Sequence, residues 1–241
     1  MGTELCLFCD NPADSAEHIF PDWLNKYITL APADPPITVT LMGLDGREAR
    51  YRSRKVAAVR HRCVCQKCNS GWMSELENEV KPFLEKAVPG QRVHLDPYGS
   101  IDIAVWAVMK AYVLEHYGGI AESSRKERAR LRKDHVPPQN AGVILAHYGP
   151  GRRSMATVLH VPNAQTPITL ASLVIGAFAV KVGFVRRKGR GGRGYGQPPV
   201  LRDENDPQAI PIFGWVSWPP PEPIPDYEAL DAWTRRASRE S

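Results

Sequence analysis

The chain has 241 residues, 43% of them hydrophobic and 24% charged, and carries a net charge of +5. This length suits one large domain or two modest ones, and the hydrophobic fraction is enough for a real core. The positive charge favours a polyanionic partner such as nucleic acid. No apolar run reaches the ~18 residues of a membrane span, and the N-terminus lacks the layout of a secretory signal. We therefore expect a cytoplasmic protein with no membrane partner.

All five cysteines lie before residue 69, which is unlike a disulfide scaffold and typical of a reducing compartment. Four of them form two Cys-x-x-Cys pairs, the usual ligand set of a structural tetrahedral zinc. The predicted zinc ligands are Cys6, Cys9, Cys65 and Cys68. The fifth cysteine, Cys63, is interpreted as a small buried residue; the alternative is a register swap with Cys65.

Between the two cysteine pairs, Glu17 stands directly before His18. The short apolar segment 16–20 that contains them predicts a strand, ended by Pro21. Adjacent side chains on a strand face opposite ways, so Glu17 and His18 are expected on opposite faces. A short helical turn over 22–27 is expected to follow.

Residues 28–62 are interpreted as an insertion built on a β-hairpin. A β-branched run over 37–41 predicts one strand, and Asp45-Gly46 predicts the turn. The return strand carries arginines at every second position, so their side chains share a face. The candidate phosphate contacts in this segment are Arg50, Arg52, Arg54, Arg60 and Arg62. We interpret them as a phosphate-tracking arm; the alternative is a charged edge strand that resists aggregation.

The second cysteine pair leads into a predicted helix that extends to about residue 86, with apolar residues at three- and four-residue spacings. Pro82 is expected to bend or end it. Asn69 stands at its start, where Asn is a favourable helix cap.

From residue 98 the chain predicts a C-terminal α+β domain. A largely buried helix is expected over 101–117, with Trp106 and Met109 in the core, and a short charged helix over 124–133. Strand-like runs separated by turns then indicate an antiparallel sheet. These runs cover 142–148, 155–161, 168–185 and 210–218, and a final helix is expected over 226–236.

One low-complexity segment, 186–196, combines glycines with cations that include Arg187 and Arg190. This composition suits contacts to a nucleic-acid backbone, but it is equally typical of a disordered hairpin tip. The predicted fold class is thus α+β, with an N-terminal domain over 1–90 and a C-terminal domain over 98–241. The C-terminal domain would supply substrate recognition or a partner surface.

The order Cys-x-x-Cys, then Glu17 to Pro21, then Cys-x-x-Cys-Asn entering a helix resembles the zinc-bearing HNH endonucleases of ββα-metal fold. The resemblance covers about residues 5–85, although the gap before the second cysteine pair is longer than in compact members. It implies that Glu17 and Asn69 hold a catalytic divalent cation and that His18 is the general base on water. Oxygen ligands suit Mg²⁺ or Mn²⁺.

The sequence departs from the HNH pattern at 60–62, where family members often carry an Asn that braces the base histidine. His61 could replace this brace, or Arg60 could instead grip phosphate. The nearest carboxylates on the predicted helix, Glu75 and Glu77, are more simply explained as exposed helix residues.

The resemblance therefore predicts a metal-dependent DNA endonuclease, with RNA not excluded as substrate. One such site cuts one strand, so double-strand cleavage would require a homodimer or two sequential nicks. The alternative is a zinc-stabilised nucleic-acid-binding module whose catalytic site has decayed, which the change at 60–62 motivates.

Overall fold

The fold is seen in a computed structural model that describes most of the chain. The described residues are 4–27, 37–42, 48–53, 59–120, 123–150, 153–161, 168–185, 208–212 and 214–235. Helices and antiparallel strands both contribute, so the predicted α+β class is confirmed. Within the described residues no helix combines the length and the apolar character needed to cross a bilayer.

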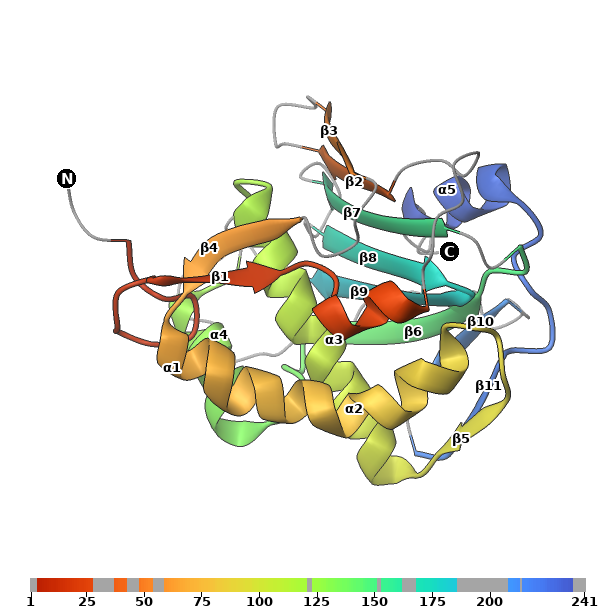
Figure 1. Ribbon diagram of the computed structural model, residues 1–241, viewed down its shortest axis with the longest axis horizontal. Helices are drawn as coiled ribbons and strands as arrows, with labels where there is room; N and C mark the ends of the chain where they lie inside the picture. The colour runs from red at the N-terminus through yellow and green to blue at the C-terminus, as the bar shows by residue number, and fades with distance from the viewer. Residues whose placement is uncertain are drawn as a thin grey trace.

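The centre of the fold is a seven-stranded sheet with helices on both faces (Figure 1). Its strand order is β10-β6-β9-β8-β7-β2-β3. All neighbours are antiparallel except β2 and β7, which run parallel. The strands are β2 (Ile37–Met42), β3 (Glu48–Ser53), β6 (Ala141–His147), β7 (Arg153–Val161), β8 (Ile168–Gly176), β9 (Phe178–Val185) and β10 (Ala209–Pro211). The predicted run 168–185 is thus two strands, β8 and β9.

The turn between β8 and β9 depends on glycine. Gly176 has a φ of +59°, in the left-handed region that other residues avoid. A Cβ at this position would lie 2.5 Å from the carbonyl oxygen of Val88. The sheet can therefore approach the end of the helix that precedes Val88 only because this residue has no side chain.

Helix α3 (Pro97–Tyr117) lies between the sheet and the N-terminal elements (Figure 1). Asp96 caps its start by accepting a hydrogen bond from the Gly99 amide at 2.8 Å. Residues 103–115 are buried on every side, which a helix can be only when it is covered by other elements all round. The predicted burial of Trp106 and Met109 is confirmed, since both are 0% exposed.

The N-terminal elements pack on the side of α3 that faces away from the sheet. They comprise β1 (Ser15–His18), the 3₁₀ turn η1 (Asp22–Lys26), β4 (Arg60–Val64), α1 (Gln66–Cys68), the π turn η3 (Asn69–Met73) and α2 (Ser74–Ala87). Strands β1 and β4 pair antiparallel as a separate two-stranded sheet. The predicted helix after the second cysteine pair is confirmed, and Pro82 lies inside α2 without ending it.

The remaining elements complete the cover of the sheet. Helix α4 (Arg125–Asp134) follows α3, strands β5 (Val93–Leu95) and β11 (Val216–Trp218) pair with each other, and α5 (Tyr227–Arg235) lies on the opposite face of the sheet. Leu230 and Trp233 of α5 join a second apolar cluster on that face. The helix predicted over 124–133 is confirmed, and α5 confirms the predicted helix 226–236 as far as Arg235, the last described residue.

The two strands of the expected hairpin are present but belong to the large sheet, and the predicted turn at Asp45-Gly46 lies outside the described residues. Strands β2 and β3 pair antiparallel, and β2 also pairs with β7. The main apolar core runs from Cys6 to Trp218 without a break at residues 90–98. The division of the chain at this point stays a prediction.

Candidate functional site

The four predicted zinc ligands meet at one end of the molecule. The sulfur atoms of Cys6, Cys9, Cys65 and Cys68 all lie within 4.8 Å of one another. Cys9 Sγ lies 3.5 Å from Cys65 Sγ and 3.7 Å from Cys68 Sγ. Sulfurs bound at ~2.3 Å to a tetrahedral zinc are about 3.8 Å apart. The cluster therefore fits a metal such as zinc. Cys63 is 0% exposed and lies outside it, as predicted.

Backbone amides point at the sulfurs. The Phe8 amide donates to Cys6 Sγ at 3.5 Å, and the Cys68 amide donates to Cys65 Sγ at 3.4 Å. The first loop is closed by the Cys6 amide, which donates to the Asn11 carbonyl at 2.8 Å. Such amide contacts stabilise thiolates and orient them toward a metal.

The ionisation of the cluster explains why a cation suits it. A hydrogen bond from Cys68 lowers the pKa of the Cys6 thiol to about 4. The same contact raises the pKa of the Cys68 thiol, and burial raises that of Cys9. Four sulfurs this close cannot all ionise by themselves, because like charges repel. A divalent cation would supply the positive charge that lets all four become thiolates.

Helix α4 holds the first cysteine loop from outside the N-terminal segment. Arg128 Nε donates to the Leu7 carbonyl at 2.9 Å, and Arg125 donates to the Cys9 carbonyl at 2.9 Å and to Asp10 at 2.5 Å. Two cations thus lie against the loop, where they would offset the negative charge of four thiolates around a bound metal.

The β1–β4 pair sets which side chains share a face. Glu17 is opposite His61, and His18 is opposite Arg60. Because side chains alternate along a strand, Glu17 and His61 point toward α3 while His18 and Arg60 point away from it. The register of β1 therefore agrees with the prediction that the Glu17 and His18 side chains point to opposite faces of the strand.

Asn69 ties the start of the π turn to β1. Its Nδ2 donates to Ser15 Oγ at 2.8 Å and to the Ala16 carbonyl at 3.2 Å. The Asn69 side chain thus lies beside the backbone that leads into Glu17 and His18. Within the described part of the chain, no hydrogen bond joins the Asn69 and Glu17 side chains directly.

The Glu17 carboxylate is engaged by a buried lysine of α3. Lys110 Nζ contacts Glu17 Oε1, lies 2.7 Å from Glu77 Oε1 and donates to the His18 carbonyl at 2.9 Å. The side chains of Lys110, Glu17 and Glu77 are 1%, 6% and 22% exposed. Burial by itself lowers the pKa of Lys110, but the two carboxylates outweigh it and raise that pKa above its ordinary value.

His18 is half-buried on the outward face of β1. Burial lowers the pKa of its imidazole below the usual value, and the positive charge of Arg60 lowers it further. Lys110 acts in the same direction, while Glu17 and Asp22 oppose it. A neutral imidazole at neutral pH is the form that can accept a proton from water.

The His61 side chain contacts α3, which is not the contact expected of a residue that braces the base histidine. Its Nε2 is 2.7 Å from His116 Nδ1, and His116 Nε2 is 3.2 Å from Glu4 Oε1. The ring of Tyr117 lies beside it, with centroids 5.1 Å apart. His61 therefore joins β4 to α3, and His116 continues the contact to Glu4 in the N-terminal segment.

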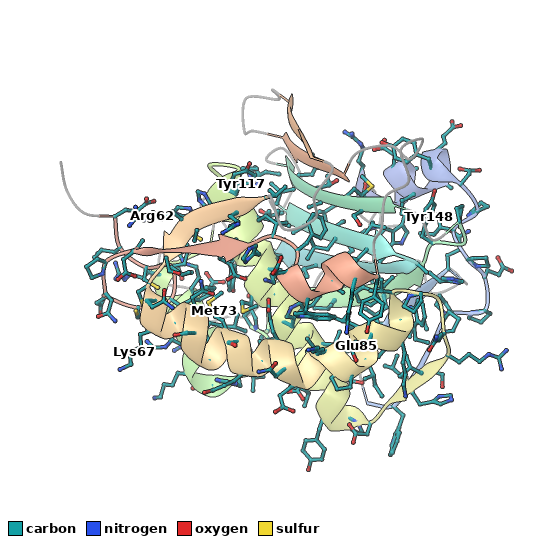
Figure 2. The ribbon with its side chains drawn as sticks, viewed as in Figure 1. Arg62, Lys67, Met73, Glu85, Tyr117 and Tyr148 are labelled. Atoms are coloured by element: carbon teal, nitrogen blue, oxygen red, sulfur yellow. The ribbon has the colours of Figure 1, made fainter. Side chains whose placement is uncertain are left out.

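Two of the predicted nucleic-acid contacts are exposed on β4. Arg60 and Arg62 both face solvent, and Arg62 also donates to the Asp14 carbonyl at 3.3 Å. Figure 2 shows Arg62 on β4 and Lys67 on α1 at the same end of the molecule. Of the other predicted contacts, Arg50 and Arg52 lie on β3, for which the structure describes the backbone. Arg54, Arg187 and Arg190 lie outside the described residues.

The donor set expected for a second, catalytic cation is present in part. The contacts described above involve Oε1 of Glu17 and Nδ2 of Asn69, and the Glu17, Glu77 and Lys110 side chains bring two carboxyl groups against one amine. A carboxylate has lone pairs enough for both an ammonium and a metal. Carboxylate and amide oxygens are the donor types that a hard divalent cation such as Mg²⁺ prefers.

Sequence reasoning missed Lys110 and His116. Lys110 falls within the buried helix expected over 101–117, and a single ammonium within the apolar run 103–114 is a signal that a buried carboxylate must lie opposite. No motif in the sequence singles out His116. Its partners lie on β4 and in the N-terminal segment, and sequence spacing does not reveal such contacts.

Comparison of the chain with models of known protein families, with curated proteins and with solved structures gave no match.

Proposed function

We propose that the chain is a metal-dependent endonuclease that hydrolyses phosphodiester bonds in DNA. The proposal rests on the resemblance of residues 5–85 to the zinc-bearing HNH endonucleases. The observation that carries it is the meeting of the four cysteine sulfurs, which brings β1 against the start of the π turn. Under this proposal, that closure is what would gather Glu17, His18 and Asn69 around one catalytic centre.

Each of these residues has a chemical role. His18 is neutral near pH 7 and takes the proton of the attacking water. Glu17 and Asn69 would hold Mg²⁺ or Mn²⁺, which supplies charge stabilisation at the scissile phosphate and the leaving oxygen. Arg60 and Arg62 lie on the same small sheet as His18 and bind the phosphates on either side of the cut.

Cleavage of supercoiled plasmid tests this function. The native chain with Mg²⁺ or Mn²⁺ is expected to convert supercoiled DNA to the nicked form, and chelation by EDTA is expected to stop it. His18→Ala is expected to bind DNA but not to nick it. Equal activity of the native chain and His18→Ala would defeat the proposal, since any residual cleavage would then come from another protein or another site.

One observation favours a second candidate function. The Lys110 ammonium already pairs with the carboxylate that would bind the metal, and Glu17 is almost fully buried. A zinc-stabilised module that binds nucleic acid without cutting it would retain such an ion pair. Salt-dependent DNA binding with no cleavage of single-stranded, double-stranded or RNA substrates in either metal would establish this alternative.

A further inference from the structure

Lys110 reaches into the proposed nuclease site from outside it. The resemblance that supports the proposed function ends near residue 85, and Lys110 lies on α3, which belongs to the following part of the chain. Its ammonium nevertheless contacts three acceptors of the N-terminal elements. These are Glu17 Oε1, the His18 carbonyl at 2.9 Å and Glu77 Oε1 at 2.7 Å.

The Lys110 ammonium makes as many of these contacts as it has N–H donors. An ammonium has three N–H donors, and Lys110 has an acceptor for each of them. The side chain is 1% exposed, so the interaction is made away from water, where it is directional and costly to leave unmade. Lys110 therefore fixes both the carboxylate of Glu17 and the peptide of His18 relative to α3.

We propose that Lys110 is a positioning residue for the nuclease, which holds Glu17 and the His18 backbone in the arrangement needed for hydrolysis. This inference rests on the proposed function. Lys110 is too deeply buried to touch DNA, so it acts only through the two residues it holds. The part of the chain after residue 90 then completes the active site in addition to any role in substrate recognition.

Two substitutions separate this role from ordinary stabilisation. Lys110→Met removes the charge and the donors with little change in length, and Lys110→Arg keeps both. A matched control is Lys133→Met, which makes the same change at an exposed position of α4. All three proteins are compared as full chains with one bound zinc each.

The expected result for folded Lys110→Met is a fall in kcat of about 10²-fold with KM nearly unchanged, since small misplacements of catalytic groups have effects of this order. Lys110→Arg should recover part of the rate, and Lys133→Met should match the native chain. The ¹³C carbonyl resonance of His18 supplies a readout that does not need activity. It should move in Lys110→Met, because that carbonyl loses its hydrogen bond.

Native kcat and an unmoved His18 carbonyl resonance in folded Lys110→Met would overturn the inference. If Lys110→Met does not fold, the double variant Glu17→Gln/Lys110→Met removes both charges of the Lys110–Glu17 ion pair. This double variant is compared with Glu17→Gln alone. The His18 carbonyl resonance should differ between these two proteins, and identical resonances would again overturn the inference. If the native chain cuts no DNA, the proposed function fails and the inferred role fails with it, while the resonance still shows whether Lys110 holds His18.

Discussion

His61 and His116 form a direct contact between β4 and α3, with Nε2 of the first 2.7 Å from Nδ1 of the second. Glu4 lies 3.2 Å from the far nitrogen of His116. Burial lowers the pKa of both imidazoles. The neighbouring His116 lowers the pKa of His61 further, and the Arg128 guanidinium lowers that of His116 further. Among the described groups, Glu4 acts in the opposite direction and raises the pKa of both.

The lowered pKa values predict loss of stability in acid. In the unfolded chain a histidine binds its proton near pH 6.5, whereas in the folded chain it does so only at lower pH. As the pH falls below about 6.5, the unfolded state gains protons first, so the free energy of unfolding should decrease. The loss should end once the pH has passed below the folded pKa values. Urea unfolding between pH 5 and pH 8 measures this.

The double variant His61→Gln/His116→Gln should show a weaker dependence of unfolding free energy on pH than the native chain. His94→Gln, at an exposed position, is the control and should leave the dependence unchanged. An equal pH dependence in the native chain and the double variant would show that this pair does not titrate on unfolding.

Metal analysis of the purified chain should find one zinc per molecule. Cys65→Ser should lose it, because each sulfur is one of four ligands, and Cys63→Ala should keep it, because Cys63 lies outside the cluster. Structural zinc contributes folding free energy on the order of 10 kcal/mol, so chelation should unfold the N-terminal elements. Retention of zinc by Cys65→Ser would contradict the assignment of ligands.

The two arginines of α4 should differ in their effect on the cysteine loop. Arg128 is half-buried and donates to the Leu7 carbonyl, so Arg128→Ala should cost about 1.5–3 kcal/mol of stability and speed the release of zinc to a chromogenic chelator. Arg125 pairs with Asp10, whose side chain is 95% exposed, so Arg125→Ala should cost at most about 1 kcal/mol. Equal effects would show that the buried contact does not hold the loop.

DNA binding should depend steeply on salt, and the arginines of β4 should account for part of that slope. Arg60→Ala and Arg62→Ala are each expected to reduce the slope of log affinity against log salt by about 1. Arg235→Ala removes a cation from α5, on the far face of the large sheet, and should leave the slope as it is. Unchanged slopes in both β4 variants would mean that this strand does not contact phosphates.

The local features of the fold could be predicted from sequence because each depends on residues close together in the chain. The cysteine spacing predicted the metal cluster, and the apolar run before Tyr117 predicted the buried helix. The bounds of β1, α4 and α5 agree with the predicted segments to within one or two residues. Turn residues and caps decide these boundaries, and both can be read locally.

The long-range contacts could not be predicted in the same way. The parallel pairing of β2 with β7 joins segments more than a hundred residues apart, and nothing in either segment specifies the other. Lys110 meets Glu17 only because α3 packs against the β1–β4 pair. Motif order alone therefore predicts the site residues, whereas the contact of Lys110 with Glu17 follows only from the three-dimensional packing.

The most direct test of the account is the single-turnover rate at which zinc-loaded protein nicks a short DNA duplex in Mn²⁺. If His18 is the general base, His18→Ala should cut about 10²- to 10⁴-fold more slowly than the native chain while binding the duplex with the same affinity. A rate in His18→Ala equal to that of the native chain, or no cutting by either protein, would contradict the proposed nuclease.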